Sequence, residues 1–231
     1  MAMKRSSRPG PATPGASAAA GAAAAQASNS ANPRPRLEPA LALLAAVCCL
    51  GALLGFGAAL DGYSHWRHPP GLLGAQGIER AAAFNLFGFV VPGLLLAVLA
   101  WRLRERYDAL GAAARIGAWL CALSALAWAG QGLLPLDPSD LDARASRLHA
   151  AMWMLWWLAF VPGAALLGLG VRQARPALTA LVWSGGGAVL ALMAASELRL
   201  LAAPPAQRLA LLLWLGCYLG AAWPAARRGL A

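Results

Sequence analysis

Six apolar runs occupy most of this chain, and each is roughly long enough to cross a bilayer as a helix. The hydrocarbon core is about 30 Å thick and a helix rises about 1.5 Å per residue, so a span needs about 20 apolar residues. The chain is 60% hydrophobic and only 12% charged, which excludes an ordinary soluble domain. We predict an all-α membrane protein, a six-helix bundle spanning residues 40–60, 81–101, 115–134, 149–170, 177–196 and 208–226.

The segment before the first span has a different composition. Residues 1–36 contain no Leu, Ile, Val, Phe, Tyr or Trp, and are rich in Ala, Pro and Ser. Such a segment cannot bury enough apolar surface to offset the entropy lost on ordering. We predict a disordered cytoplasmic tail over residues 1–37, followed by one six-span domain over residues 38–231 whose first span is an uncleaved signal anchor.

The net charge of +10 predicts an orientation. Alternating the loops across the membrane places thirteen Lys and Arg residues on the side with both termini and six on the other. Cytoplasmic loops carry the excess of basic residues, so we predict a multi-pass protein of the bacterial cytoplasmic (inner) membrane with both termini inside. Its basic residues interrupt apolar runs instead of clustering on a polar domain, so we expect membrane lipid as a partner and no nucleic acid.

The second and fourth spans contain similar segments, FVVPG at residues 89–93 and FVPG at residues 160–163. The similarity predicts helical hairpins repeated along the chain. Each proline removes one backbone hydrogen bond, which leaves the carbonyls of Gly88 and Leu158 free. Matching interruptions are typical of a transporter binding site, although proline kinks without that role are common and the middle of the membrane holds no ionisable residue.

The three histidines all fall on the predicted outer side. His68, Asp137 and His149 form the best candidate set of ligands for zinc or another divalent metal, because catalytic zinc sites use three protein ligands and leave one position for water. With a metal bound, the same three residues are the catalytic candidates of a hydrolase acting on a lipid headgroup. The alternative is that these residues are polar because they lie at the level of water, since no compact metal motif is present.

Further polar and aromatic residues lie near the outer surface. Asn85 and Gln131 are placed to line an outward-facing cavity or to join helices by hydrogen bonds, and the loop of residues 61–80 is expected to cover the mouth of the bundle. With Tyr63 and Glu197 they complete a candidate ligand-binding polar cluster. An aromatic stripe on the fourth span, from His149 to Phe160, is expected to be part of an interfacial belt. The four cysteines lie in apolar runs and are expected to pack there.

Several short motifs resemble the bacterial six-span family catalogued as domain of unknown function 998, over roughly residues 38–226. They are Gly62-Tyr63-Ser64, His68-Pro69, Asn85 with Gly88, Gly132-Leu133-Leu134-Pro135-Leu136-Asp137-Pro138, and Leu148-His149. Where that family tends to read His-Pro-x-Ser-Glu-Leu-Gly, residues 68–74 read HPPGLLG, so the serine and the carboxylate are missing. The resemblance implies an integral membrane protein without an assigned reaction.

Our leading hypothesis from the sequence is a non-enzymatic membrane protein. Its outer polar cluster either ties the loop of residues 61–80 to the bundle or binds a small or lipid ligand. The metal-assisted hydrolase and a small-molecule or lipid transporter are the alternatives.

Overall fold

The computed structural model describes residues 37–223, and every regular element in that range is a helix. The predicted tail therefore lies outside the described residues except for Leu37, which begins the first helix. The helices are α2 (Leu37–Ala59), α3 (Ala81–Phe84), η2 (Asn85–Val90), α4 (Val91–Arg106), α5 (Ala112–Leu133), α6 (Arg144–Val171), α7 (Pro176–Glu197) and α8 (Ala203–Ala222), with short turns η1 (Pro70–Gly74) and η3 (Asp108–Leu110).

Five membrane-crossing helices are supported by length and composition: α2, the continuous helix Ala81–Arg106, α5, α6 and α7. The sixth predicted span, 208–226, corresponds to α8, which begins earlier and is not apolar enough over its length to join them. The reason is its first two turns, which contain Pro204, Pro205, Gln207 and Arg208. The all-α class is thus confirmed, and the number of supported spans is five.

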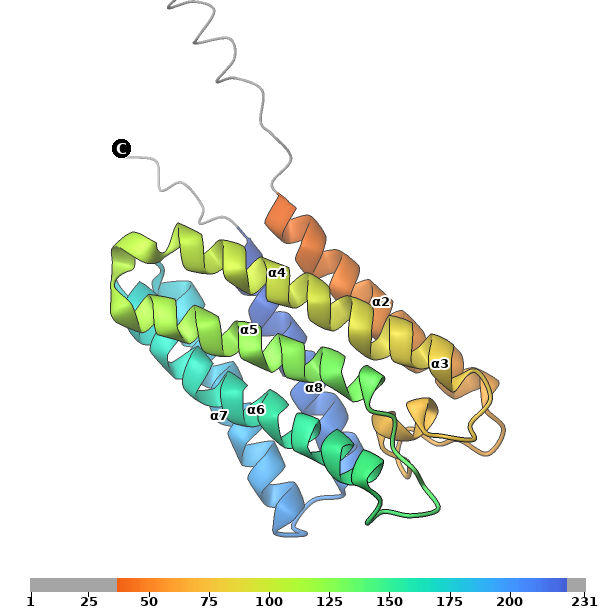
Figure 1. Cartoon of the computed structure of the whole chain (residues 1–231). Coiled ribbons are helices and arrows are strands. Elements are labelled where there is room, and N and C mark those ends of the chain that lie inside the picture. Colours follow the sequence, from red (N-terminus) through yellow and green to blue (C-terminus); the bar gives the residue numbers. More distant parts are fainter. Residues whose placement is uncertain (1–36, 224–231) are drawn as a thin grey trace, which may run out of the picture. The chain divides into compact units, whose positions relative to one another are not determined.

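The long helices run side by side and form a closed ring (Figure 1). Going around it, α2 packs on α4, α4 on α5, α5 on α6, α6 on α7 and α7 on α8, and α8 returns to α2. Each helix therefore packs against the next one in the chain, and the last long helix closes the ring against the first. The seam between α2 and α8 joins the two most distant parts of the described sequence.

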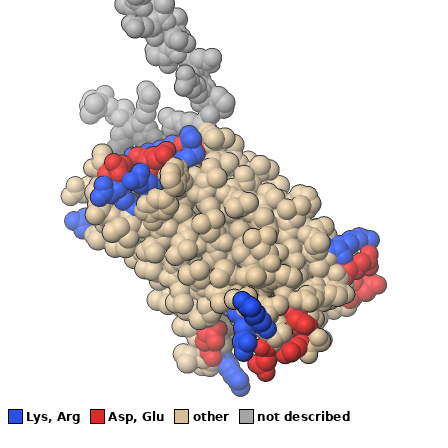
Figure 2. Space-filling model, viewed as in Figure 1, with Lys and Arg blue, Asp and Glu red and all other residues tan. Residues whose placement is uncertain are grey.

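Loops and charges gather at the two ends of the ring. Loops 60–80, 134–143 and 198–202 share the long-loop end, and loops 107–111 and 172–175 share the short-loop end (Figure 1). Figure 2 shows acidic and basic side chains at both ends, with an uncharged band between them. This distribution is what a protein embedded in a bilayer requires, because charges are costly in hydrocarbon.

The two Pro-Gly segments differ in local structure. Before Pro92 the helix widens into the π-helical turn η2, in which the N–H of Val91 donates to the carbonyl of Leu86, five residues earlier. Pro162 instead lies inside an uninterrupted α6. The sequence similarity therefore does not produce two copies of the same interruption.

Other helices satisfy two carbonyls of η2. In an α-helix the carbonyl of Gly88 would accept from residue 92, but proline has no N–H. The indole Nε1 of Trp128 in α5 donates to the Gly88 oxygen at 3.0 Å. The thiol of Cys48 in α2 donates to the Phe87 oxygen at 3.1 Å. The interruption caused by Pro92 thus joins this helix to both of its neighbours.

The glycine after each proline has a packing role. A Cβ added at Gly93 would meet the α5 backbone at Ala129 N, 2.6 Å away, and one added at Gly163 would meet Cys121 N at 3.1 Å. The two motifs therefore let α4 and α6 approach α5 closely from two sides. Close approach through small residues is the usual way in which membrane helices pack without a hydrophobic driving force.

Polar contacts secure the short-loop end. Glu38, whose side chain is only 9% exposed, accepts from the guanidinium groups of Arg102 at 3.3 Å and Arg106 at 3.0 Å, which joins the start of α2 to the end of α4. Arg175 donates to the Tyr107 hydroxyl and to the Trp223 carbonyl, at 2.5 and 2.6 Å. The two bonds of Arg175 join the loop before α7 to the ends of α4 and α8.

Candidate functional site

The loop of residues 60–80 is held against α8 by Tyr63. Arg208 Nη2 donates to the Tyr63 hydroxyl at 2.6 Å, and that hydroxyl donates to the Pro69 carbonyl at 3.4 Å. Within the loop, the Ser64 N–H donates to His68 Nδ1 at 3.0 Å. Burial raises the pKa of the Tyr63 phenol, against the opposing effect of the Arg208 charge. The predicted residues Tyr63 and His68 therefore shape the loop.

A second group of predicted residues holds the same loop from the other side of the ring. Asn85 Nδ2 donates to the Gly74 carbonyl at 2.9 Å. The ring of His149 lies against Gly71, where an added Cβ would be 2.9 Å from Nε2, and its Nδ1 is 2.9 Å from the Leu134 carbonyl. Both glycines belong to η1, so Asn85 and His149 fix this short turn over the long-loop end of the bundle.

Asp137 has a local role in its own loop. Its Oδ1 accepts from the backbone N–H of Ser139 at 2.9 Å and from the Ser139 hydroxyl at 2.6 Å. These two bonds hold the pKa of the Asp137 carboxyl below its usual value. The Asp137 N–H donates to Ser146 Oγ at 3.1 Å, which joins the loop to the start of α6. Asp137 therefore organises a turn.

The structure does not bring His68, Asp137 and His149 together as ligands of one metal ion. Within residues 37–223, no group of three or more His, Cys, Asp or Glu side chains is placed to hold a metal. His68 Nδ1 is engaged by Ser64, Asp137 Oδ1 by Ser139, and His149 Nδ1 by the Leu134 carbonyl. Each of the three side chains is instead hydrogen-bonded within its own neighbourhood.

The other two members of the predicted cluster differ in their surroundings. Gln131 in α5 is 1% exposed, and its Nε2 has no hydrogen-bond partner within the described part of the chain. Glu197 is exposed at the end of α7 and forms no ion pair with any residue of 37–223. The predicted cluster is therefore divided: Tyr63 contacts Arg208, Asn85 contacts Gly74, Gln131 is buried in α5, and Glu197 is exposed at the end of α7.

The aromatic stripe of α6 lies in the core and is not an interfacial belt. Trp156 is 0% exposed and Phe160 is 1% exposed. The Trp156 ring packs against Trp128 of α5 and Trp214 of α8, with centroids 5.1 and 5.7 Å apart. The expectation was wrong because this stripe faces the centre of the ring, where α5, α6 and α8 meet.

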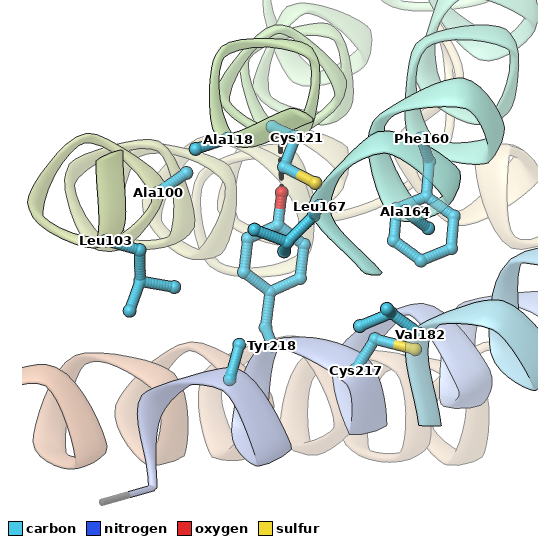
Figure 3. A pocket seen from close by; sticks show the side chains of 11 residues that line it. Ala100, Leu103, Ala118, Cys121, Phe160, Ala164, Leu167, Val182, Cys217 and Tyr218 are labelled. Atoms are coloured by element: carbon cyan, nitrogen blue, oxygen red, sulfur yellow. Dashed lines mark hydrogen bonds between the residues drawn. The ribbon is translucent and has the colours of Figure 1, made fainter. Parts of the chain in front are cut away.

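A small apolar cavity lies in the interior between α4, α5, α6, α7 and α8 (Figure 3). Its volume is about 20 Å³, and Tyr218 crosses it to donate to the Cys121 carbonyl at 2.5 Å. Cys121 and Cys217 both line it, as their apolar surroundings predict. A space of this size holds about one water molecule, so it is not a ligand site.

A larger apolar groove opens on the side of the ring, at the seam between α2 and α8. It encloses about 460 Å³, within the range of ligand-binding pockets. Leu54 of α2 and Leu212 of α8 are among the leucines that form its walls, while His65, Trp66 and Arg208 lie at its long-loop end. Burial and the Arg208 charge both lower the pKa of His65.

The sequence interpretation missed this groove. Arg208 was counted only as a loop charge, and Trp66 was not considered. Two residues could have indicated it: Arg208, at the first position of a predicted span, and Trp66, in the loop expected to cover the mouth of the bundle. The missing information was that the first and last helices of the ring are neighbours.

The fold and the site define a class of protein. A ring of helices, five of them long and apolar enough to cross a bilayer, with charges at its two ends and an uncharged band between them on the face in Figure 2, is an integral multi-pass membrane protein. The chain belongs to the family described as protein of unknown function (DUF998), whose model matches residues 43–227. This match confirms the resemblance seen in the motifs. No curated protein and no solved structure matches the chain.

Proposed function

We propose that this chain is a non-enzymatic, six-span protein of the bacterial cytoplasmic membrane whose extracytoplasmic face binds a small or lipid ligand. The observation that carries the proposal is the open groove between α2 and α8 beneath a loop that Tyr63, Asn85 and His149 fix in place. A fixed loop beside an open groove is a preformed site, which lowers the entropy lost on binding. The sixth span is α8, because Trp214 and Leu211 are buried among the other helices.

Both termini lie on the cytoplasmic side in this proposal. The short-loop end carries Arg102, Arg104, Arg106, Arg115, Arg172 and Arg175 against three carboxylates, and the long-loop end has as many basic as acidic residues. The excess of positive charge marks the cytoplasmic end. The long-loop end, with Tyr63, Asn85 and the groove, is then extracytoplasmic.

Polar side chains inside the spans support a binding role over transport. Ser124 Oγ accepts from the Trp214 indole at 3.0 Å, and Thr179 Oγ1 donates to the Gly168 carbonyl at 3.1 Å. Both bonds join helices, which is the common use of such residues in membranes. Among residues 37–223 no observation favours the hydrolase or the transporter.

Cysteine labelling tests the orientation. Ser139 and Gln173 are exposed in loops at opposite ends of the ring. In a Cys48→Ala background, where the other cysteines are buried, Ser139→Cys is expected to react with a membrane-impermeant maleimide in intact cells. Gln173→Cys is expected to react only after the membrane is opened. The reverse pattern would place the groove on the cytoplasmic side and overturn the proposal.

Ligand retention tests the binding role. The full chain is purified in mild detergent and examined by native mass spectrometry for a co-purified ligand, before and after adding membrane lipid extract. We expect an adduct that is lost in Leu54→Trp, which fills the groove, and kept in Leu126→Trp. Both leucines are exposed, at 61% and 48%, but Leu126 lies on α5 away from the seam. If no lipid or small molecule binds the unmodified chain, the proposal fails.

A further inference from the structure

Arg208 is a cation without a counter-charge. Among residues 37–223 no carboxylate lies within ion-pairing distance of it. Its Nη1 donates to the Pro204 carbonyl at 2.9 Å and its Nη2 to the Tyr63 hydroxyl at 2.6 Å. A guanidinium has five N–H donors, so these two bonds leave three unused. One of these is on Nε, which is buried and has no partner within the described residues.

Arg208 lies near the long-loop end of α8. It lies five residues after Ala203, the first residue of α8, or about 7.5 Å along the helix axis. Leu54 lies five residues before Ala59, the last residue of α2, at a similar depth. With α8 as the sixth span, as proposed above, Arg208 would lie near the boundary between headgroups and hydrocarbon, where an unpaired charge strongly favours an anionic partner.

The remainder of the groove is apolar and continues toward the middle of the membrane. Leu50 lies one helical turn below Leu54, and Leu212 one turn below Arg208. The leucines on the lipid side are open, with Leu209 51% and Leu212 48% exposed. Trp66 is 76% exposed beside Arg208, and tryptophan side chains prefer the level of the headgroups.

We infer that the groove between α2 and α8 binds an anionic phospholipid, with its phosphate on Arg208 and one acyl chain along Leu50, Leu54 and Leu212. This inference rests on the proposed function and narrows the ligand to one class. Nη1 and Nη2 of Arg208 each keep one N–H free of the bonds to Pro204 and Tyr63, and such a pair of donors suits two phosphate oxygens. The groove accepts a chain that enters sideways from the bilayer, so the lipid need not leave the membrane.

Paired lipids of equal chain length test the inference. The delipidated full chain in neutral detergent is titrated with phosphatidylglycerol, phosphatidylcholine or water-soluble glycerol 3-phosphate, and binding is followed by native mass spectrometry and thermal shift. We expect phosphatidylglycerol to bind at least about tenfold more tightly than phosphatidylcholine, because the choline cation offsets the phosphate charge and weakens the charge-assisted hydrogen bonds to arginine. Glycerol 3-phosphate is expected to bind far more weakly than the lipid.

Variants assign the binding to the groove. Arg208→Gln is expected to reduce phosphatidylglycerol affinity at least about tenfold and to remove the preference over phosphatidylcholine. Arg147→Gln removes an exposed arginine from the same end of the ring and is expected to change nothing. Because Arg208 also holds Tyr63, Leu54→Trp provides a second test, in which the groove is filled at an exposed position and both lipids are lost.

Each other result overturns the inference in a recognisable way. If both lipids bind equally and Leu54→Trp abolishes both, the proposed ligand-binding function stands but the anionic class is wrong. If glycerol 3-phosphate binds as tightly as phosphatidylglycerol, the ligand is a free anion and the groove does not bind an acyl chain. A stable dimer that binds no lipid identifies a second copy of the chain as the occupant. If nothing binds at all, the proposed function fails as well.

Discussion

The indole of Trp128 donates its hydrogen bond to the carbonyl of Gly88, which in an α-helix would accept from residue 92, a proline without an N–H in this chain. Pro92 therefore provides no donor for this carbonyl, and Trp128 of α5 provides one. Both the Trp128 side chain and Gly88 are buried, so the carbonyl has no access to water. A buried carbonyl without a donor destabilises a fold by about 1–3 kcal/mol.

The first prediction follows from this pair. Trp128→Phe keeps an aromatic ring and removes the donor, so we expect it to lower the free energy of unfolding by about 1–3 kcal/mol. In a Pro92→Ala background we expect the helix to return to α-helical bonding, in which residue 92 donates to Gly88, so that the same substitution has a smaller effect. Denaturant unfolding in micelles measures the double-mutant cycle. Equal effects in both backgrounds would show that the hydrogen bond contributes nothing.

The second prediction concerns the turn that covers the long-loop end. A Cβ at Gly74 would overlap Asn85 Oδ1, so Gly74→Ala must displace the side chain that holds η1. We expect a loss of about 1–3 kcal/mol and faster proteolysis within residues 60–80. The control is Gly51→Ala, because Gly51 has open space around it and should tolerate the methyl group. Resistance of the Gly74 variant to protease would contradict a fixed loop.

The third prediction compares two ion pairs. Glu38 is nearly buried between two arginines, whereas Glu79 and Arg80 form a pair whose side chains are 77% and 63% exposed. Glu38→Gln is expected to lower stability by about 1–2 kcal/mol, reduced from the value for a fully buried pair because the arginines are partly exposed. Glu79→Gln is expected to have no measurable effect. A similar loss in both variants would argue against a specific role for Glu38.

The fourth prediction is a pH dependence at His65. Burial and the neighbouring Arg208 lower its pKa in the folded state, so protonation favours the unfolded chain. Its contribution to stability is therefore present above the ordinary histidine pKa of about 6.5 and is lost as the pH falls below it. Between pH 7.5 and 5, the free energy of unfolding is expected to fall more steeply in the unmodified chain than in His65→Gln. Parallel curves would exclude His65 as the source.

The sequence predicted the helices well because the bilayer fixes their length. It was less accurate at the ends, as α6 begins at Arg144 although its span was placed from residue 149. Hydropathy reports the part of a helix that lies in hydrocarbon, and the first turns of α6 carry Arg144, Ser146 and Arg147. For the same reason the predicted span began at residue 208, although α8 begins at Ala203 with two turns that contain polar residues.

The site was predictable only where its contacts are local. The freed carbonyl of Gly88 followed from Pro92 by a rule of helix geometry, but its donor Trp128 lies 40 positions away. Asp137 was judged by residue type, and its engagement by Ser139 depends on the conformation of one turn. Arg208 and Tyr63 are separated by 145 positions, and only the closure of the ring brings them together.

The closure of the ring also sets an order for biosynthesis. The ribosome delivers α2 first among the described helices and α8 last, so the seam between them stays open until the final long helix is inserted. A chain cut short anywhere before α8 lacks the neighbour of α2 and the arginine that holds Tyr63. A chain that ends before α8 therefore leaves the ring open between α7 and α2.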